Sequence, residues 1–358
     1  MADSSLRIRI ITIHGIPNFG SAFQSMALCR HLAKCGYRDV KVIDYNPPYF
    51  KPHTLRSIAG VALNLRDCRI RDRRYGDFLR ANVPLTSRSF ASLRELEGED
   101  FGADVYIAGG DQLWNVYHDC GRDDAYKLIF AKGKKISYGT SLGQSDFTDE
   151  QLGELAEKIR DFSAVSVRES TSVDMLASKG IAARHVADPV FLLDRSDYES
   201  ILVEPDDERY LLVYMVTPSK LLEDCIERLA KRHGLKVVLC FGLSKKCTCD
   251  KHDKAAGPAE ILGYIKNAEF VLSASYHATA FSTMFHKQFF TLLPDQHTNE
   301  RILDYLSMRG LEGRIVTEAT DLDKTLSERI DYAAPDGYDL FVSQSKQYLQ
   351  QALEFRDR

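Results

Sequence analysis

The chain lacks any apolar run that approaches the ~18 residues of a membrane-spanning helix. Residues 1–5 also lack the apolar core of a signal peptide. Basic residues are not in excess, because the formal net charge is -4 and the pI is near 6.2, whereas a general nucleic-acid binder usually has a strongly basic domain. These absences predict a cytoplasmic protein that binds no nucleic acid and is at most peripheral on the inner face of a membrane.

A disulfide framework and a metal motif are also missing. The eight cysteines are mostly scattered in apolar segments, as expected of reduced, buried thiols. Cys247 and Cys249, followed by His252, come nearest to a zinc motif, but a fourth ligand is not close by and the spacing is wrong. We therefore expect no metal and no resident cofactor.

The apolar runs predict two α/β domains. With 358 residues and 44% hydrophobic composition, the chain is long enough for two domains of roughly 100–200 residues each. Strand-like runs alternate with helical patterns, and the alternation restarts after the polar residues 204–208, which favours parallel sheets covered by helices. We predict two Rossmann-like doubly wound domains facing across a cleft. The predicted strands are residues 8–13, 40–45, 105–108, 136–138, 164–167, 210–216, 236–241, 270–272 and 288–292, and the predicted helices are residues 21–34, 220–233, 259–267, 279–285 and 344–355.

Residues 273–281, with the sequence SASYHATAF, are the most informative segment. They follow an apolar strand and lead into a helix of small residues, a junction that directs backbone N–H groups and the positive end of a helix dipole at an anion such as phosphate. A histidine there, His277, can donate or accept a proton beside the bound anion. The plain alternative is a Ser/Thr cluster that caps a helix, with an incidental histidine.

Five further segments accompany this one in a fixed order: residues 12–24, 105–115, 136–143, 165–170 and 185–193. The ordered set resembles the polysaccharide pyruvyl transferase family from about Ile10 to about Arg314. The resemblance implies a metal-independent transferase of exopolysaccharide or capsule biosynthesis that forms a pyruvate ketal on a sugar from phosphoenolpyruvate, releasing phosphate. It also implies a GT-B-like architecture with an acceptor domain (residues 1–203), a donor domain (204–335) and a C-terminal helix (336–358) that crosses back to the first domain.

The resemblance assigns the donor site to the histidine motif and one arginine. His277 would protonate the methylene group of the donor, and Arg168 would bind its carboxylate or phosphate with a two-pronged guanidinium at the cleft. The alternative for Arg168 is a surface arginine paired with Glu169 or Asp174. The remaining donor-binding residues, with the amides of the last two forming a phosphate nest, would be Ser275, Tyr276, Ala278 and Thr279.

The histidine motif departs from the family pattern at two positions. The family has an acidic residue where this chain has Ala274, and one branch has arginine where this chain has Ser275. These departures keep open a non-catalytic, sugar-binding relative as an alternative function. A second alternative is a GT-B-type glycosyltransferase that uses a nucleotide sugar.

The acceptor site is assigned to the first domain. Asp111 would be the base that deprotonates a sugar hydroxyl, and Trp114 would stack on the sugar, although core packing is the equal alternative for a tryptophan. We expect Asn18 and Gly20 to form a turn after the first strand, where glycine lets the backbone approach a ligand. The other acceptor-binding residues would be Gln112 and Asn115.

Residues 51–80 are unusually basic, with eight basic residues against three acidic ones, a net of +5. Apolar residues recur at helical spacing just before the arginine cluster, which predicts an amphipathic helix with a basic end. Such a helix suits an anionic membrane surface and an acceptor linked to lipid pyrophosphate. The alternative is a solvated helix face packed on the first domain.

Overall fold

The computed structural model describes residues 5–51, 55–240, 242, 244–293, 300–333 and 337–354, and the side chains of residues 55–58 are not described. The chain divides into two compact units. Unit 1 comprises Met1–Lys51, Leu79–Asp194 and Tyr338–Arg358, and unit 2 comprises Pro52–Phe78 and Arg195–Gly337. The division therefore falls earlier than residue 204, and residues 52–78 join the second unit rather than the first. The predicted strand and helix ends at residues 241 and 355 lie outside the described residues.

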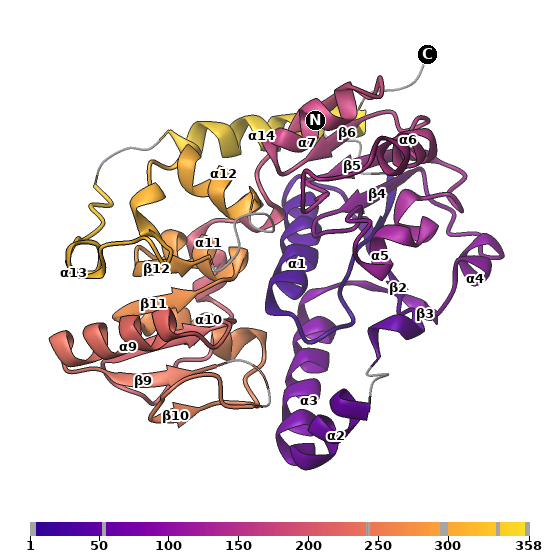
Figure 1. Ribbon diagram of the computed structural model, residues 1–358. Coiled ribbons are helices and arrows are strands. Elements are labelled where there is room, and N and C mark those ends of the chain that lie inside the picture. The colour runs from indigo at the N-terminus through magenta and orange to yellow at the C-terminus, as the bar shows by residue number, and fades with distance from the viewer. Residues whose placement is uncertain are drawn as a thin grey trace. The chain divides into compact units, whose positions relative to one another are not determined.

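Unit 1 is built on a parallel sheet with the strand order β3-β2-β1-β4-β5. Isolated bridges from Ile136 to Ala164 and from Thr140 to Val167 extend this sheet to the parallel pair β6-β7. Figure 1 shows these strands in indigo to magenta, covered by helices. The strands are β1 (Arg7–Ile11), β2 (Asp39–Tyr45), β3 (Leu85–Phe90), β4 (Val105–Gly109), β5 (Lys134–Tyr138), β6 (Val165–Val167) and β7 (Ala183–His185).

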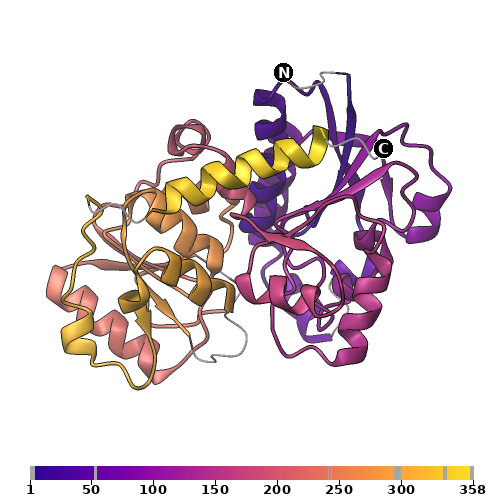
Figure 2. The ribbon, with the colours of Figure 1, turned by 90° about the horizontal axis from the view of Figure 1, so that it is seen from above.

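The helices of unit 1 include one that returns from the far end of the chain. Helix α14 packs on unit 1, where Ser345 Oγ accepts a hydrogen bond from the amide of Ala187 at 2.9 Å and Tyr338 makes an edge contact with Phe191. Figure 2 shows α14 as one continuous yellow helix. The helices are α1 (Phe19–Lys34), α4 (Leu93–Glu97), α5 (Asp119–Arg122), α6 (Asp149–Lys158), α7 (Ser170–Ala177), α14 (Tyr338–Glu354) and the 3-10 helices η1 (Pro48–Phe50), η2 (Asp124–Lys127) and η3 (Pro189–Leu192).

Unit 2 repeats the plan with a six-stranded parallel sheet in the order β10-β9-β8-β11-β12-β13. Its strands are β8 (Tyr210–Tyr214), β9 (Lys236–Leu239), β10 (Lys251–His252), β11 (Phe270–Ser273), β12 (Gln288–Leu292) and β13 (Ile315–Val316). Its helices are α2 (Leu55–Leu63), α8 (Arg195–Glu199), α9 (Lys220–His233), α10 (Pro258–Asn267), α11 (Tyr276–Met284), α12 (Glu300–Met308), α13 (Leu322–Thr325) and the 3-10 helix η4 (Glu312–Arg314), together with the part of α3 (Leu65–Asn82) up to Phe78.

The basic segment packs on unit 2 through specific contacts rather than resting on the first domain. Arg74 on α3 pairs with Glu260 on α10 at 2.9 Å and donates a hydrogen bond to the carbonyl of Ala255. Lys254 donates to the side chain of Asn64 at 2.9 Å. These contacts fix one face of α3 while Leu63, at the end of α2, stays 86% exposed.

The central strands form because their sequences are apolar on both faces. All five residues of β4 and all five of β8 are buried, as expected for the inner strands of a parallel sheet that carries helices on both sides. Each unit thus encloses its own core, and the polar residues that follow the strands collect at the carboxyl edges of the sheets.

Candidate functional site

The strand order locates a ligand-binding position in each unit. In an open parallel sheet, ligands bind outside the carboxyl ends of the strands, where the order reverses. In unit 1 the reversal lies between β1 and β4, because β2 and β3 extend from one side of β1 and β4 adds to the other. In unit 2 it lies between β8 and β11. The loops after β1 and β4, and those after β8 and β11, are therefore the expected ligand-binding positions.

A buried polar network centred on Arg168 organises the carboxyl edge of unit 1. Its guanidinium Nη1 lies 2.5 Å from Asp188 Oδ2, Nε lies 3.4 Å from Glu169 Oε1, and Nη2 lies 3.9 Å from Asp111 Oδ1. The Arg168 side chain is only 1% exposed. Arg168 does pair with Glu169, as the alternative expected, but in the interior rather than at the surface.

Hydroxyl and amide groups of the protein donate hydrogen bonds to the buried carboxylates of Asp188 and Glu169. Gln24 on α1 donates to Asp188 at 2.7 Å, and the backbone amide of Val190 donates to the same carboxylate at 3.0 Å. Ser141 and Ser172 both donate to Glu169. Because each of these carboxylates accepts several hydrogen bonds, the network is rigid.

Asp111 is the member of this network that reaches solvent. It follows β4 and has a left-handed backbone, φ 54°, directly after Gly110 at φ 68°. Ser21 donates to Asp111 Oδ2 at 2.5 Å, and the amide of Gln112 donates to Oδ1 at 2.8 Å. Its side chain is 11% exposed, more than the buried carboxylates beside it. A non-glycine residue held with positive φ is a feature that clusters at functional sites.

The other predicted acceptor residues divide into two groups. Gln112 and Asn115 lie together, with Asn115 Nδ2 donating to Gln112 Oε1 at 2.7 Å. Trp114 instead is fully buried, and its Nε1 donates to the carbonyl of Tyr126 at 3.0 Å, so the ring fills the core and presents no face to a sugar. This burial matches the core-packing alternative.

Asn18 and Gly20 begin a helix rather than form a turn. Asn18 is the N-cap of α1, and its Oδ1 accepts a hydrogen bond from the amide of Gly20 at 3.0 Å. Gly20 lies in the first helical turn and is buried. The expectation of an open glycine turn was wrong because the capping asparagine starts the helix two residues earlier than its apolar pattern indicated.

Sequence reasoning missed a buried pair at the ends of β1 and β2. His14 Nε2 lies 3.0 Å from Asp44 Oδ1, and His14 Nδ1 lies 3.1 Å from the carbonyl of Thr12. Burial would raise the pKa of Asp44, but hydrogen bonds from His14, Asn46 and Ser89 outweigh it and lower that pKa. The only sequence signal was a histidine shortly after the first strand and an acidic residue near the end of the second.

In unit 2 the predicted donor residues gather where β11 passes into α11. Ser275 is the N-cap, and its Oγ accepts from the amide of Ala278 at 3.4 Å. The amide of Thr279 donates to the Ser275 carbonyl at 3.0 Å. The two amides assigned to a phosphate nest are thus used by the cap and the first turn, and the helix begins at Tyr276, three residues before its predicted start.

His277 lies in the first turn of α11 and is 7% exposed. The ring of Tyr276 meets it edge-on, with centroids 5.2 Å apart. Thr279 Oγ1 hydrogen-bonds Thr291 Oγ1 on β12 at 3.0 Å, which ties the helix start to the neighbouring strand. The topology therefore places an ionisable side chain and a helix N-terminus together at the switch point of unit 2.

The structure describes residues 5–51, 55–240, 242, 244–293, 300–333 and 337–354, and two features are absent from these ranges. No group of three or more His, Cys, Asp or Glu side chains there is arranged to hold a metal ion. None of the helices in the same ranges is both long and apolar enough to cross a bilayer. The acidic network of unit 1 is occupied by the Arg168 guanidinium.

Comparison with known proteins gives a family match and fold neighbours. The model of the family described as polysaccharide pyruvyl transferase matches residues 18–296, most of the chain. No curated protein sequence matches the chain.

Among solved structures, the chain is similar to the UDP-GlcNAc 2-epimerase of Methanocaldococcus jannaschii in complex with UDP-GlcNAc and UDP, with a TM-score of 0.54 and 14% identity over 97% of this chain and 99% of that one. A second UDP-N-acetylglucosamine 2-epimerase gives a TM-score of 0.55 and 11% identity over 99% and 97%. The Neisseria meningitidis enzyme bound to UDP-GlcNAc gives 0.51 and 11% over 98% and 95%. At such identities the likeness shows the fold alone, which is the GT-B-like α/β fold.

Proposed function

This chain belongs to the polysaccharide pyruvyl transferase family and is a transferase, and from that premise we propose that it transfers pyruvate from phosphoenolpyruvate to two hydroxyls of a sugar in a polysaccharide precursor. The product is a cyclic ketal, and inorganic phosphate is released. The observation that carries the proposal is the position of His277, in the first turn of α11 at the switch point of unit 2.

The reaction adds one proton to carbon and one to the departing phosphate, and it removes two protons from the sugar hydroxyls. His277 donates a proton to the methylene carbon of phosphoenolpyruvate, which becomes a methyl group and leaves a cationic carbon at C2. The first sugar hydroxyl attacks C2 and gives its proton to a base. The bond from C2 to the phosphate oxygen then breaks, phosphate departs, and the second hydroxyl attacks C2 and loses its proton.

The start of α11 suits the anionic donor for electrostatic reasons. The amides of the first helical turn point along the helix axis and carry the positive end of its dipole. Ala278 and Thr279 already donate to Ser275, so we assign the donor's phosphate to the leading amides of the helix rather than to that pair. Ser275 and Tyr276, on either side of the junction, are the remaining donor contacts in this proposal.

The acceptor is assigned to the carboxyl edge of unit 1. Asp111, whose side chain is 11% exposed, is the proposed base for a sugar hydroxyl, with Gln112 and Asn115 as hydrogen-bonding partners. The buried Arg168 network places a positive charge beside Asp111, because Arg168 Nη2 lies 3.9 Å from Asp111 Oδ1. Asp44, which His14 holds in place, is a second carboxylate on the same edge that can accept a hydrogen bond from a sugar hydroxyl.

An acceptor linked to lipid pyrophosphate would bring the protein to a membrane surface. Leu63 and Leu65, at the junction of α2 and α3, are 86% and 44% exposed. They precede an arginine-rich helix in which Arg66, Arg69 and Arg73 are exposed. Exposed leucines beside arginines are the combination that binds an anionic bilayer surface. We therefore include peripheral membrane contact in the proposal.

The test is incubation with phosphoenolpyruvate and a galactosyl acceptor, with phosphate release and the ketal methyl group followed together. His277→Asn should abolish most of both signals, whereas His286→Asn is the matched control at the other end of the same helix. His286 has a left-handed backbone, φ 55°, which asparagine tolerates. Normal ketal formation by His277→Asn would refute the assignment.

The same assay, repeated with a nucleotide sugar added, separates the two alternatives. Transfer from a nucleotide sugar would release a nucleoside diphosphate and no inorganic phosphate from phosphoenolpyruvate. A sugar-binding relative without catalysis would bind the acceptor and release neither. The replacement of the family's acidic residue by Ala274 is the observation that keeps the second alternative open.

A further inference from the structure

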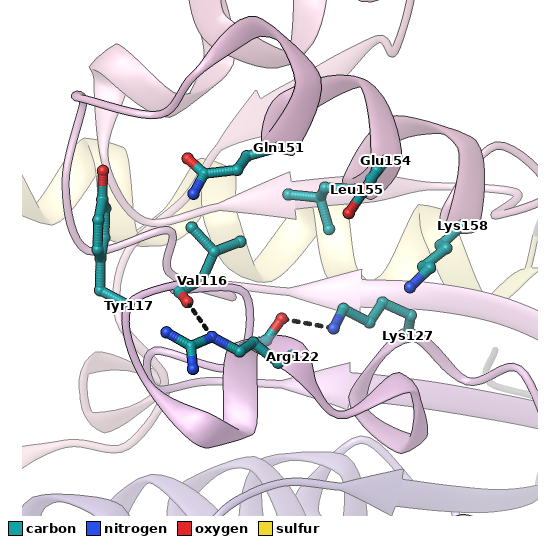
Figure 3. Close-up of a pocket in the computed structure, with 9 residues that line it drawn as sticks. Val116, Tyr117, Arg122, Lys127, Gln151, Glu154, Leu155 and Lys158 are labelled. Carbon is teal, nitrogen blue, oxygen red and sulfur yellow. Dashed lines mark hydrogen bonds between the residues drawn. The ribbon is translucent and has the colours of Figure 1, made fainter.

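Unit 1 contains a cavity of about 350 Å³ that the proposed reaction does not use. Its wall begins at Val116, directly after the predicted acceptor residue Asn115, and is completed by α5, η2 and α6 (Figure 3). Small-molecule sites span roughly 300–1,000 Å³, so this cavity fits a ligand at the small end of that range. The lining residues are Val116, Tyr117, Gly121, Arg122, Lys127, Gln151, Glu154, Leu155 and Lys158.

The cavity is physically continuous with the loop that carries the acceptor residues. The amide of Tyr117 donates to Asn115 Oδ1 at 3.1 Å. A Cβ atom at Gly121 would lie only 1.8 Å from the Asn115 carbonyl oxygen, so glycine is required for the wall to fold against this loop. The cavity wall therefore packs directly on the loop that carries Gln112 and Asn115.

The cavity carries an excess of one positive charge. The residues that line it include three cations and one carboxylate, Glu154, and a second carboxylate, Asp124, lies 2.8 Å from Lys158 and 3.6 Å from Lys127. Lys127 is buried and donates to the carbonyls of Gly121 and Asp123. Burial lowers the pKa of Lys127 to about 8, which an anion nearby would reverse.

The remaining lining groups suit a sugar ring. Tyr117 Oη donates to the carbonyl of Asp146 at 2.9 Å and its ring stands edge-on to Phe147, so the ring is fixed while 42% of the residue stays exposed. Gln151 Oε1 accepts from the amide of Thr148, which orients the NH₂ end of its side chain. In Figure 3 Tyr117, Gln151 and Arg122 line one side of the cavity.

We propose that this cavity binds a sugar unit of the acceptor that carries one anionic group, next to the sugar that receives the ketal. Arg122, whose Nε donates to the Val116 carbonyl at 2.9 Å, presents the rest of its fork to the anionic group. Tyr117 supplies an aromatic face for the ring, and Glu154 accepts from its hydroxyls. The inference rests on the proposed function only where it identifies the ligand as part of the acceptor. Binding of an acidic sugar in the cavity does not require pyruvyl transfer.

Calorimetry of the full chain without phosphoenolpyruvate tests the site with three probes: galacturonic acid, galactose 1-phosphate and galactose. Binding of either acidic sugar, on the order of tenfold tighter than galactose, supports the proposal, because a charge-assisted hydrogen bond is worth about one such factor. Which acidic sugar binds better shows whether the charge comes from a carboxylate or a phosphate. Equal affinity for all three sugars, or binding of neither acidic sugar, overturns the proposal.

Two variants assign the binding to the cavity. Arg122→Gln should weaken acidic-sugar binding by about tenfold, and Lys158→Gln gives a second reading from another element. Arg160→Gln is the control, because Arg160 is an exposed arginine just after α6 that does not line the cavity. Unchanged binding in both cavity variants refutes the location. Loss of pyruvyl transfer with acidic-sugar binding intact would count against the proposed function and leave this site standing.

Discussion

Replacing Arg168 by methionine should destabilise unit 1 by about 3 kcal/mol. Removing one partner of a buried ion pair costs about 3–5 kcal/mol, since the other partner is left buried without compensation. Arg168 is 1% exposed and faces Asp188, Glu169 and Asp111. The lower end of the range applies because Asp188 keeps donors from Gln24 and from a backbone amide.

The assay is urea unfolding followed by tryptophan fluorescence. Trp114 is the sole tryptophan, is fully buried and lies in the same unit as Arg168, so its emission reports unit 1 alone. The matched control is Arg88→Met, which removes an arginine that is 60% exposed and pairs with Glu99 at 3.2 Å. Exposed pairs contribute about 0–1 kcal/mol. Arg168→Lys, which keeps the charge but loses the fork, should fall between the two.

Two results would refute this reasoning. A cost for Arg168→Met that equals that of Arg88→Met would mean that the network does not hold the carboxyl edge together. The cost should also shrink in acid, because protonated carboxylates need no counter-charge. A cost that is constant between neutral and acidic pH would show that lost packing, not uncompensated charge, is responsible.

Four further predictions follow from single features. His277→Asn should lower turnover in ketal formation by about 10²–10⁴ with its far-UV circular dichroism unchanged; near-normal turnover would contradict this. Burial, with Lys346 nearby, lowers the pKa of His31 to about 4. The neutral imidazole therefore contributes roughly 3 kcal/mol to the free energy of unfolding above pH 6.5, and this contribution is lost as the pH falls toward 4. His31→Gln should flatten the pH dependence of the urea midpoint over that window, and an unchanged slope would exclude His31. Trp114→Ala should cost about 3–5 kcal/mol by circular dichroism, whereas a cost under 1 kcal/mol would contradict core packing. Sedimentation with anionic vesicles should fall in Leu63→Ser, and no binding of the parent protein at low salt would remove the membrane contact.

The sequence predicted the elements whose stabilisation is local or fully apolar. The helix α9 and the strand β12 were predicted with their observed bounds, since Ser219 caps the helix, Gly234 in the left-handed region ends it, and the strand carries the buried Phe289, Phe290 and Leu292. Strand β3 was missed because it is an edge strand whose exposed Ser87–Ser89 stretch resembles a loop. Edge strands give a weak apolar signal by their nature.

The site could be predicted only where one segment carries it. The junction at His277 was evident because strand, cap and histidine are contiguous in the chain. The pairing of His14 with Asp44 joins a residue that follows β1 to one on β2, and that of Arg168 with Asp188 joins residues that follow β6 and β7. Such contacts depend on which strands become neighbours. The assignment of residues 52–78 to unit 2 likewise depends on the contact of Arg74 with Glu260.

The return of α14 to unit 1 sets an order in which the protein is finished on the ribosome. The amide of Ala187 cannot donate its hydrogen bond to Ser345 until 158 further residues have been synthesised, and these residues include the whole sheet of unit 2. Unit 2 needs only residues 52–78, which have already emerged, to complete its own packing. The unit whose synthesis begins second is therefore the first that a nascent chain can close, and the part of unit 1 that α14 covers stays open to chaperones until translation has passed Glu354.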